Sequence, residues 1–137
     1  MKSIRILMLC IFAATSLAAC ASPAPSLNPL EGDWTLFAYR KTSPIEGTTI
    51  TARFENGEVH GSGGCNSYFG AYVLDGAQLT IEGLGWTEMA CMNPEGVMEQ
   101  EQTVLGYLSD AESFEVDTGR LIIHVGGQET LTFEPTE

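Results

Sequence analysis

The chain has 137 residues, of which six are basic and 18 are acidic, so its formal net charge is −12. This length suits one domain with a single hydrophobic core. The negative charge excludes nucleic acid as a partner, because that binding depends on Lys and Arg side chains that neutralise phosphates. It also disfavours contact with anionic lipid headgroups, so any link to a membrane must be made by an anchor.

The first 19 residues are typical of a secretory signal peptide. Lys2 and Arg5 precede an apolar run at residues 6–14, and small residues follow it. The uncharged stretch, residues 6–21, is shorter than the roughly 20 residues that a membrane-spanning helix needs. We therefore expect residues 1–19 to direct the chain out of the cytoplasm and then to be removed.

The end of this segment resembles the bacterial lipobox. Residues 17–20 read Leu-Ala-Ala-Cys, and in a lipobox the chain is cut before the cysteine, which is then acylated. Ala21 resembles the residue found in lipoproteins sent to the outer membrane of Gram-negative cells. We expect Cys20 to be lipidated and the chain to face the periplasm, held by its acyl chains alone. The alternative is an ordinary signal peptide in which Cys20 has no special role.

Residues 20–29 contain three prolines and predict an extended tether. Residues 30–137 form the predicted domain, and most of its segments read as short strands separated by turn signals such as Glu-Asn-Gly and Asp-Gly. The expected strands cover residues 32–39, 49–54, 58–63, 66–74, 77–83, 112–116, 120–125 and 129–134. The predicted fold class is α+β, mainly β: an antiparallel meander curled into a barrel-like sheet, with one helix packed on it.

The helix is expected within residues 93–110. Asn93 is a plausible N-cap and Pro94 suits the first helical position. The apolar side chains that share one helical face are Val97, Val104, Leu105 and Leu108, with Met98 at its edge.

Glu101 falls inside this apolar face, where an unpaired carboxylate is costly. The carboxylate is expected to be bonded to backbone N–H groups or to one of two arginines, Arg53 and Arg120. The alternative is a functional polar group at the floor of a cavity.

The cysteine count predicts one disulfide. Cys10 leaves with the signal peptide and Cys20 carries the lipid, so Cys65 and Cys91 remain for the oxidising compartment. Two buried free thiols are the alternative. Other chemistry is poorly supported, because the two cysteines are too far apart for a Cys-x-x-Cys redox pair and lack the close second ligand of a zinc site. A nucleophilic Cys65 would need a base, for which His60 and His124 are the histidines available.

The glycine-rich stretch at residues 61–70 is no phosphate-binding loop. Gly61 and Gly63 are followed by Asn66 where the dinucleotide fingerprint has its last glycine, and a strand pattern follows rather than a helix. We expect these glycines to let the backbone bend sharply between two strands.

The order of these motifs resembles the META domain, or HslJ-like, family over about residues 30–133. The residues that carry the resemblance most specifically are Gly64, Cys65, Asn66, Tyr68, Gly70, Thr87, Met89, Ala90 and Cys91. The resemblance implies a small β-rich fold with one helix, often in an envelope lipoprotein, and it places Cys65, Cys91 and Glu101 on family positions. It links some members to heat shock and novobiocin tolerance and others to motility or virulence. It implies no enzyme activity and no cofactor.

Two functions are compatible with these features. The first is a non-enzymatic accessory of the envelope stress response that binds a protein. The second is a small-ligand or lipid binder with a cavity between helix and sheet, like the lipid-binding secretin pilot lipoprotein to which the fold is likened. The possible binding residues are Glu101, Tyr68 and Tyr72, although Phe69 and Val73 occupy the opposite strand face and either pair could be the exposed one. No catalytic or metal-binding residue is predicted.

Overall fold

The computed structural model describes residues 28–137. The predicted signal peptide, the predicted lipidation site Cys20 and most of the predicted tether lie outside the described residues. Within the described range, no helix is long and apolar enough to cross a membrane.

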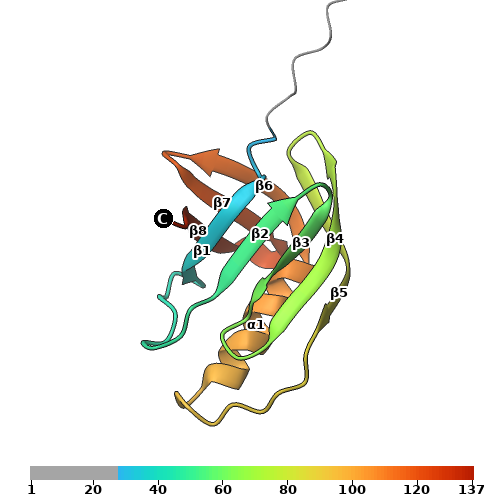
Figure 1. Ribbon diagram of the computed structural model, residues 1–137. Helices are drawn as coiled ribbons and strands as arrows, with labels where there is room; N and C mark the ends of the chain where they lie inside the picture. The colour runs from blue at the N-terminus through green and yellow to red at the C-terminus, as the bar shows by residue number, and fades with distance from the viewer. Residues whose placement is uncertain (1–27) are drawn as a thin grey trace, which may run out of the picture.

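Eight antiparallel strands close into a barrel, and one helix packs against it (Figure 1). The strands are β1 (Gly32–Tyr39), β2 (Thr51–Glu55), β3 (Glu58–Ser62), β4 (Ser67–Asp75), β5 (Gln78–Trp86), β6 (Ala111–Asp117), β7 (Arg120–Val125) and β8 (Glu129–Pro135). The helix α1 (Val97–Ser109) lies between β5 and β6, and a short 3-10 turn, η1 (Gly126–Gln128), precedes β8. Each strand pairs with its neighbour along the chain, and β1 pairs with β8 to close the barrel. The predicted fold class is confirmed.

Alternation along the strands fills the barrel with apolar side chains, because successive residues of a strand point to opposite faces. On β4, Tyr68 and Tyr72 point inward and are buried, whereas Phe69 and Val73 point outward and are more than half exposed. The Tyr72 ring meets the Phe54 ring edge to face, with 5.4 Å between the ring centroids. The exposed pair on this strand is therefore Phe69 and Val73.

The helix packs against the barrel, mainly against β5 and β8. Among residues 28–137, β5 and β6 pair at one register position, Gln78 with Ser113. On the apolar face of α1, which lies between β5 and β6 in the chain, Val104, Leu105 and Leu108 join the barrel core. The predicted apolar face of the helix is confirmed, and burial of this face fixes α1 against the sheet.

The predicted start of the helix is wrong by several residues. The helix begins at Val97, after Gly96, whose φ of 84° lies in the left-handed region. A residue in this conformation cannot belong to a right-handed helix, and glycine adopts it without steric cost. Asn93 and Pro94 therefore lie in the preceding turn, in which the Val97 N–H donates to the Pro94 carbonyl over 3.2 Å.

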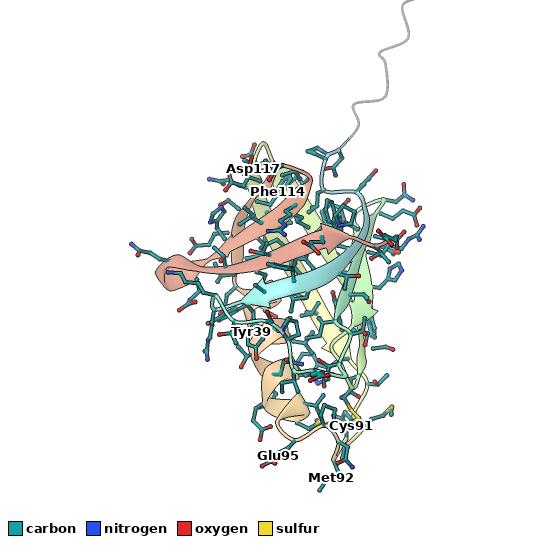
Figure 2. The ribbon with its side chains drawn as sticks, turned by 90° about the vertical axis from the view of Figure 1, so that its left-hand side faces the viewer. Tyr39, Cys91, Met92, Glu95, Phe114 and Asp117 are labelled. Carbon is teal, nitrogen blue, oxygen red and sulfur yellow. A yellow bond between two sulfur atoms is a disulfide. The ribbon has the colours of Figure 1, made fainter. Side chains whose placement is uncertain are left out.

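The segment before α1 and the first described residues lie at opposite ends of the molecule. Figure 2 shows Cys91, Met92 and Glu95 at one end, and Asp117 near the end where the described chain begins. A tether that enters at Asn28 thus joins the barrel far from the segment that leads into the helix.

Candidate functional site

Glu101 lies at the junction of the helix with the glycine-rich loop between β3 and β4, and it is 2% exposed. Its Oε2 accepts hydrogen bonds from the backbone N–H groups of Cys65 and Asn66, over 3.0 and 2.6 Å. Its Oε1 accepts a bond from Nδ2 of Asn66 over 2.6 Å. The prediction that backbone N–H groups satisfy this carboxylate is confirmed.

The two arginines that the sequence offers as partners for Glu101 lie elsewhere, on the outer surface. Arg53 pairs with Asp33 and Glu55, and Arg120 pairs with Glu134. The carboxylate at the helix is therefore balanced by N–H dipoles rather than by a cation.

Asn66 extends this network to the segment after β5. Its Oδ1 accepts bonds from the Met89 backbone N–H and the Thr87 hydroxyl, each over 2.7 Å. Its Nδ2 also donates to the Met89 carbonyl over 3.2 Å. The Asn66 amide thus forms hydrogen bonds with both backbone groups of Met89, as a neighbouring strand would. All the hydrogen-bonding groups of this amide are used, and no buried side-chain nitrogen or oxygen in residues 28–137 lacks a partner. The network holds the segment to the barrel and leaves no polar atom free.

Glycine at position 63 makes room for the carboxylate. A Cβ atom at Gly63 would lie 2.7 Å from Oε2 and 2.8 Å from Cγ of Glu101, closer than real Cβ contacts allow. Gly64 follows with a φ of 109°, which side chains rarely permit. Glycine is therefore required at these two positions for different reasons. Gly63 allows the close approach of Glu101, and Gly64 allows the backbone conformation of the bend.

A disulfide joins Cys65 to Cys91, with their Cα atoms 6.0 Å apart. It adds a covalent link between the same two segments that Asn66 connects by hydrogen bonds. With both sulfurs in this bond, neither acts as the thiolate nucleophile or metal ligand that the sequence left open. The structure also shows no cluster of three or more metal-ligating side chains within residues 28–137.

Tyr68 and Tyr72, which the sequence offers as possible binding residues, are both buried inside the barrel and present little surface to solvent. Tyr68 is 1% exposed and its hydroxyl donates to the Thr51 carbonyl over 2.7 Å, which explains how a phenol is accommodated inside the barrel. Burial raises the pKa of the Tyr68 hydroxyl. Tyr72 is also buried, and desolvation raises the pKa of its hydroxyl, which lies 3.4 Å from Glu31. The inward alternation of β4 is the physical reason for both placements.

Sequence reasoning missed a second polar anchor on the helix, Gln100. This buried side chain accepts a bond from the Ile45 N–H over 2.7 Å and donates to the Thr48 hydroxyl over 3.0 Å. It thereby holds the loop between β1 and β2 against the start of α1. The signal that could have found it is its position next to Glu101 on the buried side of the helix.

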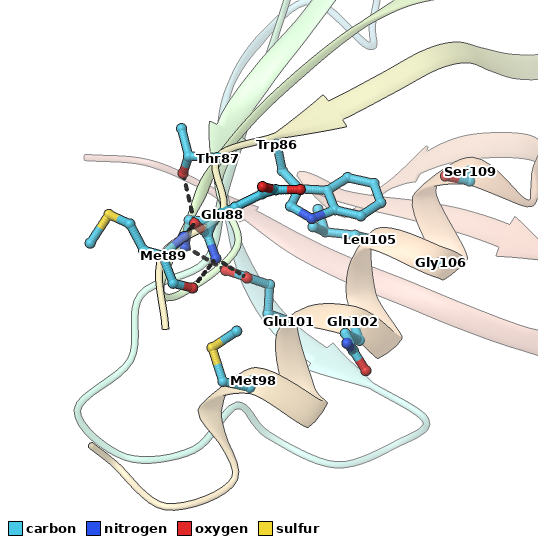
Figure 3. A pocket seen from close by; sticks show the side chains of 11 residues that line it. Trp86, Thr87, Glu88, Met89, Met98, Glu101, Gln102, Leu105, Gly106 and Ser109 are labelled. Atoms are coloured by element: carbon cyan, nitrogen blue, oxygen red, sulfur yellow. Dashed lines mark hydrogen bonds between the residues drawn. The ribbon is translucent and has the colours of Figure 1, made fainter. Parts of the chain in front are cut away.

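A groove of about 530 Å³ runs between α1 and the segment that follows β5 (Figure 3). Its residues are Asn66, Trp86, Thr87, Glu88, Met89, Met98, Glu101, Gln102, Leu105, Gly106 and Ser109. Trp86 and Met89 are 50% and 59% exposed, so the groove offers apolar surface to solvent. In Figure 3 the Trp86 indole extends over the part of α1 that carries Leu105 and Gly106.

The residues that carry the family resemblance, together with Glu101, either line this groove or support it from behind. We call Asn66, Glu101 and the disulfide Cys65–Cys91 the supporting frame of the groove. Four of them line it, Asn66, Thr87, Met89 and Glu101, and these are also the members of the hydrogen-bond network. The sequence did not single out Trp86 or Gln102, because their neighbours are brought in from separate elements. Gly106 lies on α1 where the helix borders the groove, and a Cβ there would meet no atom within 4 Å.

Three solved structures share this fold. An NMR structure of a protein from Burkholderia xenovorans is 25% identical, covers 94% of this chain and 99% of that chain, and has a TM-score of 0.67. A second NMR structure is 22% identical, with coverages of 79% and 94% and a TM-score of 0.63. A crystal structure of a DUF4847 family protein from Bacteroides vulgatus is 13% identical, covers 80% and 95%, and has a TM-score of 0.55. The second and third of these likenesses show the fold alone.

No match was found among curated proteins. The META domain model matches residues 26–137, which include the whole barrel, the helix and the disulfide. On that match, the chain belongs to the META domain family.

Proposed function

We propose that this protein is a non-enzymatic lipoprotein of the bacterial cell envelope that binds a protein partner in the groove beside α1. It is held at the periplasmic face of the outer membrane by lipidated Cys20. The observation that carries this proposal is the solvent-open apolar groove, in which Trp86 and Met89 are about half exposed. Apolar and aromatic side chains of this kind are enriched at protein interfaces.

The frame behind the groove supports a binding role. Glu101, Asn66 and the disulfide fix the segment of residues 87–91 to the barrel, so the groove is largely preformed. A preformed site loses little conformational entropy when it is occupied.

The position of the groove supports a periplasmic protein as the partner. The described chain begins at the end of the barrel opposite the segment that leads into α1 (Figure 2). A lipid anchor reached through that beginning would leave this segment facing away from the membrane. The negative net charge also favours a partner in the periplasm over the membrane surface, because it opposes contact with anionic headgroups.

Site-specific photocrosslinking in living cells tests the proposal. A photoreactive residue at Gln102, in the groove, is expected to give protein-sized adducts, and one at Val116, an exposed position on β6, is expected to give none. Gly106→Phe should abolish the Gln102 adducts, because the phenyl ring fills the groove. Gly106→Ala should keep them and is the matched control, because both changes replace glycine with a better helix former and differ in side-chain size. Equal adducts from both labelled positions would contradict the proposal.

A small apolar ligand is the second candidate function, and the size of the groove favours it. About 530 Å³ falls within the range of roughly 300–1,000 Å³ that is usual for small-molecule sites. Native mass spectrometry of the mature chain from the periplasm distinguishes the two functions. A retained mass of a few hundred daltons, lost in Gly106→Phe, supports the small ligand.

The stress role is tested in cells that lack the protein. We expect them to lose tolerance to heat or novobiocin, and to regain it from the wild-type gene but not from a gene with Gly106→Phe. Restoration by Cys20→Ser, which removes the acyl anchor, would show that membrane attachment is not part of the function.

A further inference from the structure

We propose that the groove recognises a basic, apolar segment of the partner, and that Trp86 and Glu88 hold a Lys or Arg side chain of this segment. The inference rests on the proposed protein-binding function and adds the chemistry of the partner. It follows from the charges, the aromatic surface and the methionines at the groove.

The cation site consists of an indole and a carboxylate on the same wall. Trp86 and Glu88 both belong to the chain at the end of β5, and both side chains point toward α1 in Figure 3. The face of an indole attracts a cation, and a nearby carboxylate adds a direct charge attraction. Glu88 is exposed and forms no salt bridge with any residue between 28 and 137, so its charge is available.

No protein cation competes for this site within the described chain. Its four basic residues are Arg40, Lys41, Arg53 and Arg120, and none of them lines the groove. Arg53 and Arg120 already pair with acids on the outer surface. The local charge is negative and favours a positively charged partner.

The methionines favour a peptide over a small cation. Met89 and Met98 line the groove, and Met92, which is 83% exposed, continues the apolar surface beyond it. Thioether side chains are flexible and polarizable, and such surfaces accommodate varied peptide side chains. A small cation would leave most of this surface uncovered, whereas an extended peptide can cover it. Across the groove, Gln102 and Ser109 offer polar groups to the peptide backbone.

Calorimetric titration with three matched peptides tests the inference. The protein is the mature chain with Cys20→Ala, which removes only the acyl anchor. The probes are capped octapeptides of leucine and threonine that contain two lysines, two glutamines or two glutamates at the same positions. We expect the lysine peptide to bind roughly three- to tenfold more tightly than the glutamine peptide. The glutamate peptide should bind most weakly, and added salt should reduce the differences.

Variants assign the preference to the two residues. Glu88→Gln and Trp86→Leu should each reduce the preference for lysine over glutamine, and Glu95→Gln, a nearby exposed acid outside this groove, should leave it unchanged. Equal affinity for all three peptides, or an unchanged preference in Glu88→Gln, would overturn the inference. Tight binding of dodecyltrimethylammonium without binding of the lysine peptide would also overturn it, in favour of a small amphiphilic cation.

The same set of variants separates this inference from the proposed function. If Gln102 crosslinks to a protein in cells and Glu88→Gln leaves those adducts unchanged, the partner's charge has been misassigned but protein binding stands. If no protein adduct forms at Gln102, the proposed function itself fails.

Discussion

Replacement of Glu101 by Gln changes one acceptor in the buried network and keeps the size of the side chain. The carboxylate accepts three hydrogen bonds, two from backbone N–H groups and one from Asn66 Nδ2. A glutamine oxygen in the place of Oε2 retains the backbone bonds, but its NH₂ group then faces Nδ2 of Asn66. Rotation of the Asn66 amide would relieve this contact and would place its NH₂ against the Met89 N–H instead. Every arrangement of the two amides therefore brings two donors together.

The expected loss follows from the cost of a buried donor without an acceptor, about 1–3 kcal/mol. Glu101→Gln should lower the free energy of unfolding by this amount. Glu101→Ala should lower it by about 2–5 kcal/mol, because it leaves at least two buried donors unpaired and opens a cavity. Against a total stability of about 5–15 kcal/mol for a domain, both variants are expected to fold.

Urea unfolding of the oxidised mature chain measures this loss. Trp34 is buried, and its indole N–H donates to the Leu30 carbonyl over 2.9 Å. Unfolding exposes this indole to water, so the change in its fluorescence reports global unfolding. Glu99→Gln is the matched control, because Glu99 is exposed on the same helix and should change stability by less than about 0.5 kcal/mol. If Glu101→Gln lowers the free energy of unfolding by no more than that control, the two amides can be arranged without opposed donors and the reasoning is refuted.

Three further changes test the frame and the barrel core. Gly63→Ala should cost about 1–3 kcal/mol in urea unfolding, because its Cβ would lie 2.7 Å from Glu101 Oε2; unchanged stability would show that the carboxylate moves freely. Reduction of Cys65–Cys91 by dithiothreitol should lower the unfolding free energy by about 3 kcal/mol, with Cys65→Ser/Cys91→Ser as the check; equal urea midpoints with and without reductant would contradict this. Tyr68→Phe should cost about 0.5–1.5 kcal/mol at pH 7 through its lost bond to Thr51. Because burial raises the pKa of Tyr68 in the folded state, its contribution is complete below the unfolded pKa of about 10 and is lost as pH rises further; the stability of the variant should therefore fall less steeply above pH 10.

The strands could be predicted from the sequence because their signals are local. Alternation and the turn residues define β1 with the bounds that were predicted, and Asn56 and Gly57 form the expected turn with φ values of 53° and 83°. The helix start could not be placed in the same way, because two plausible signals compete within four residues. Asn93 and Pro94 favour an early start, but the left-handed conformation of Gly96 ends any helix that begins before it.

The buried acid and its need for backbone N–H donors were predictable, whereas the residues that supply these donors were not. Helical periodicity places Glu101 on the apolar face of α1. Its hydrogen-bond partner Asn66 is 35 positions away in the sequence, and only the closed barrel brings the two together. A cavity between helix and sheet was one of the expectations, but its lining residues could not be named, because Trp86 and Gln102 come from a strand end and a helix that the sequence does not pair.

The residues that identify the family are the ones least free to bind a ligand. Asn66, Glu101 and the two cysteines use their polar atoms and sulfurs on one another, on the Thr87 hydroxyl and on the backbone of Met89. They explain why the segment beside the helix keeps its position, and this position would be the same for any occupant of the groove. The chemistry of the occupant must instead be set by the exposed side chains at Trp86, Glu88 and Gln102 and by the open space at Gly106. A second protein with the same frame and a basic residue in place of Glu88 should therefore fold alike and prefer an acidic partner.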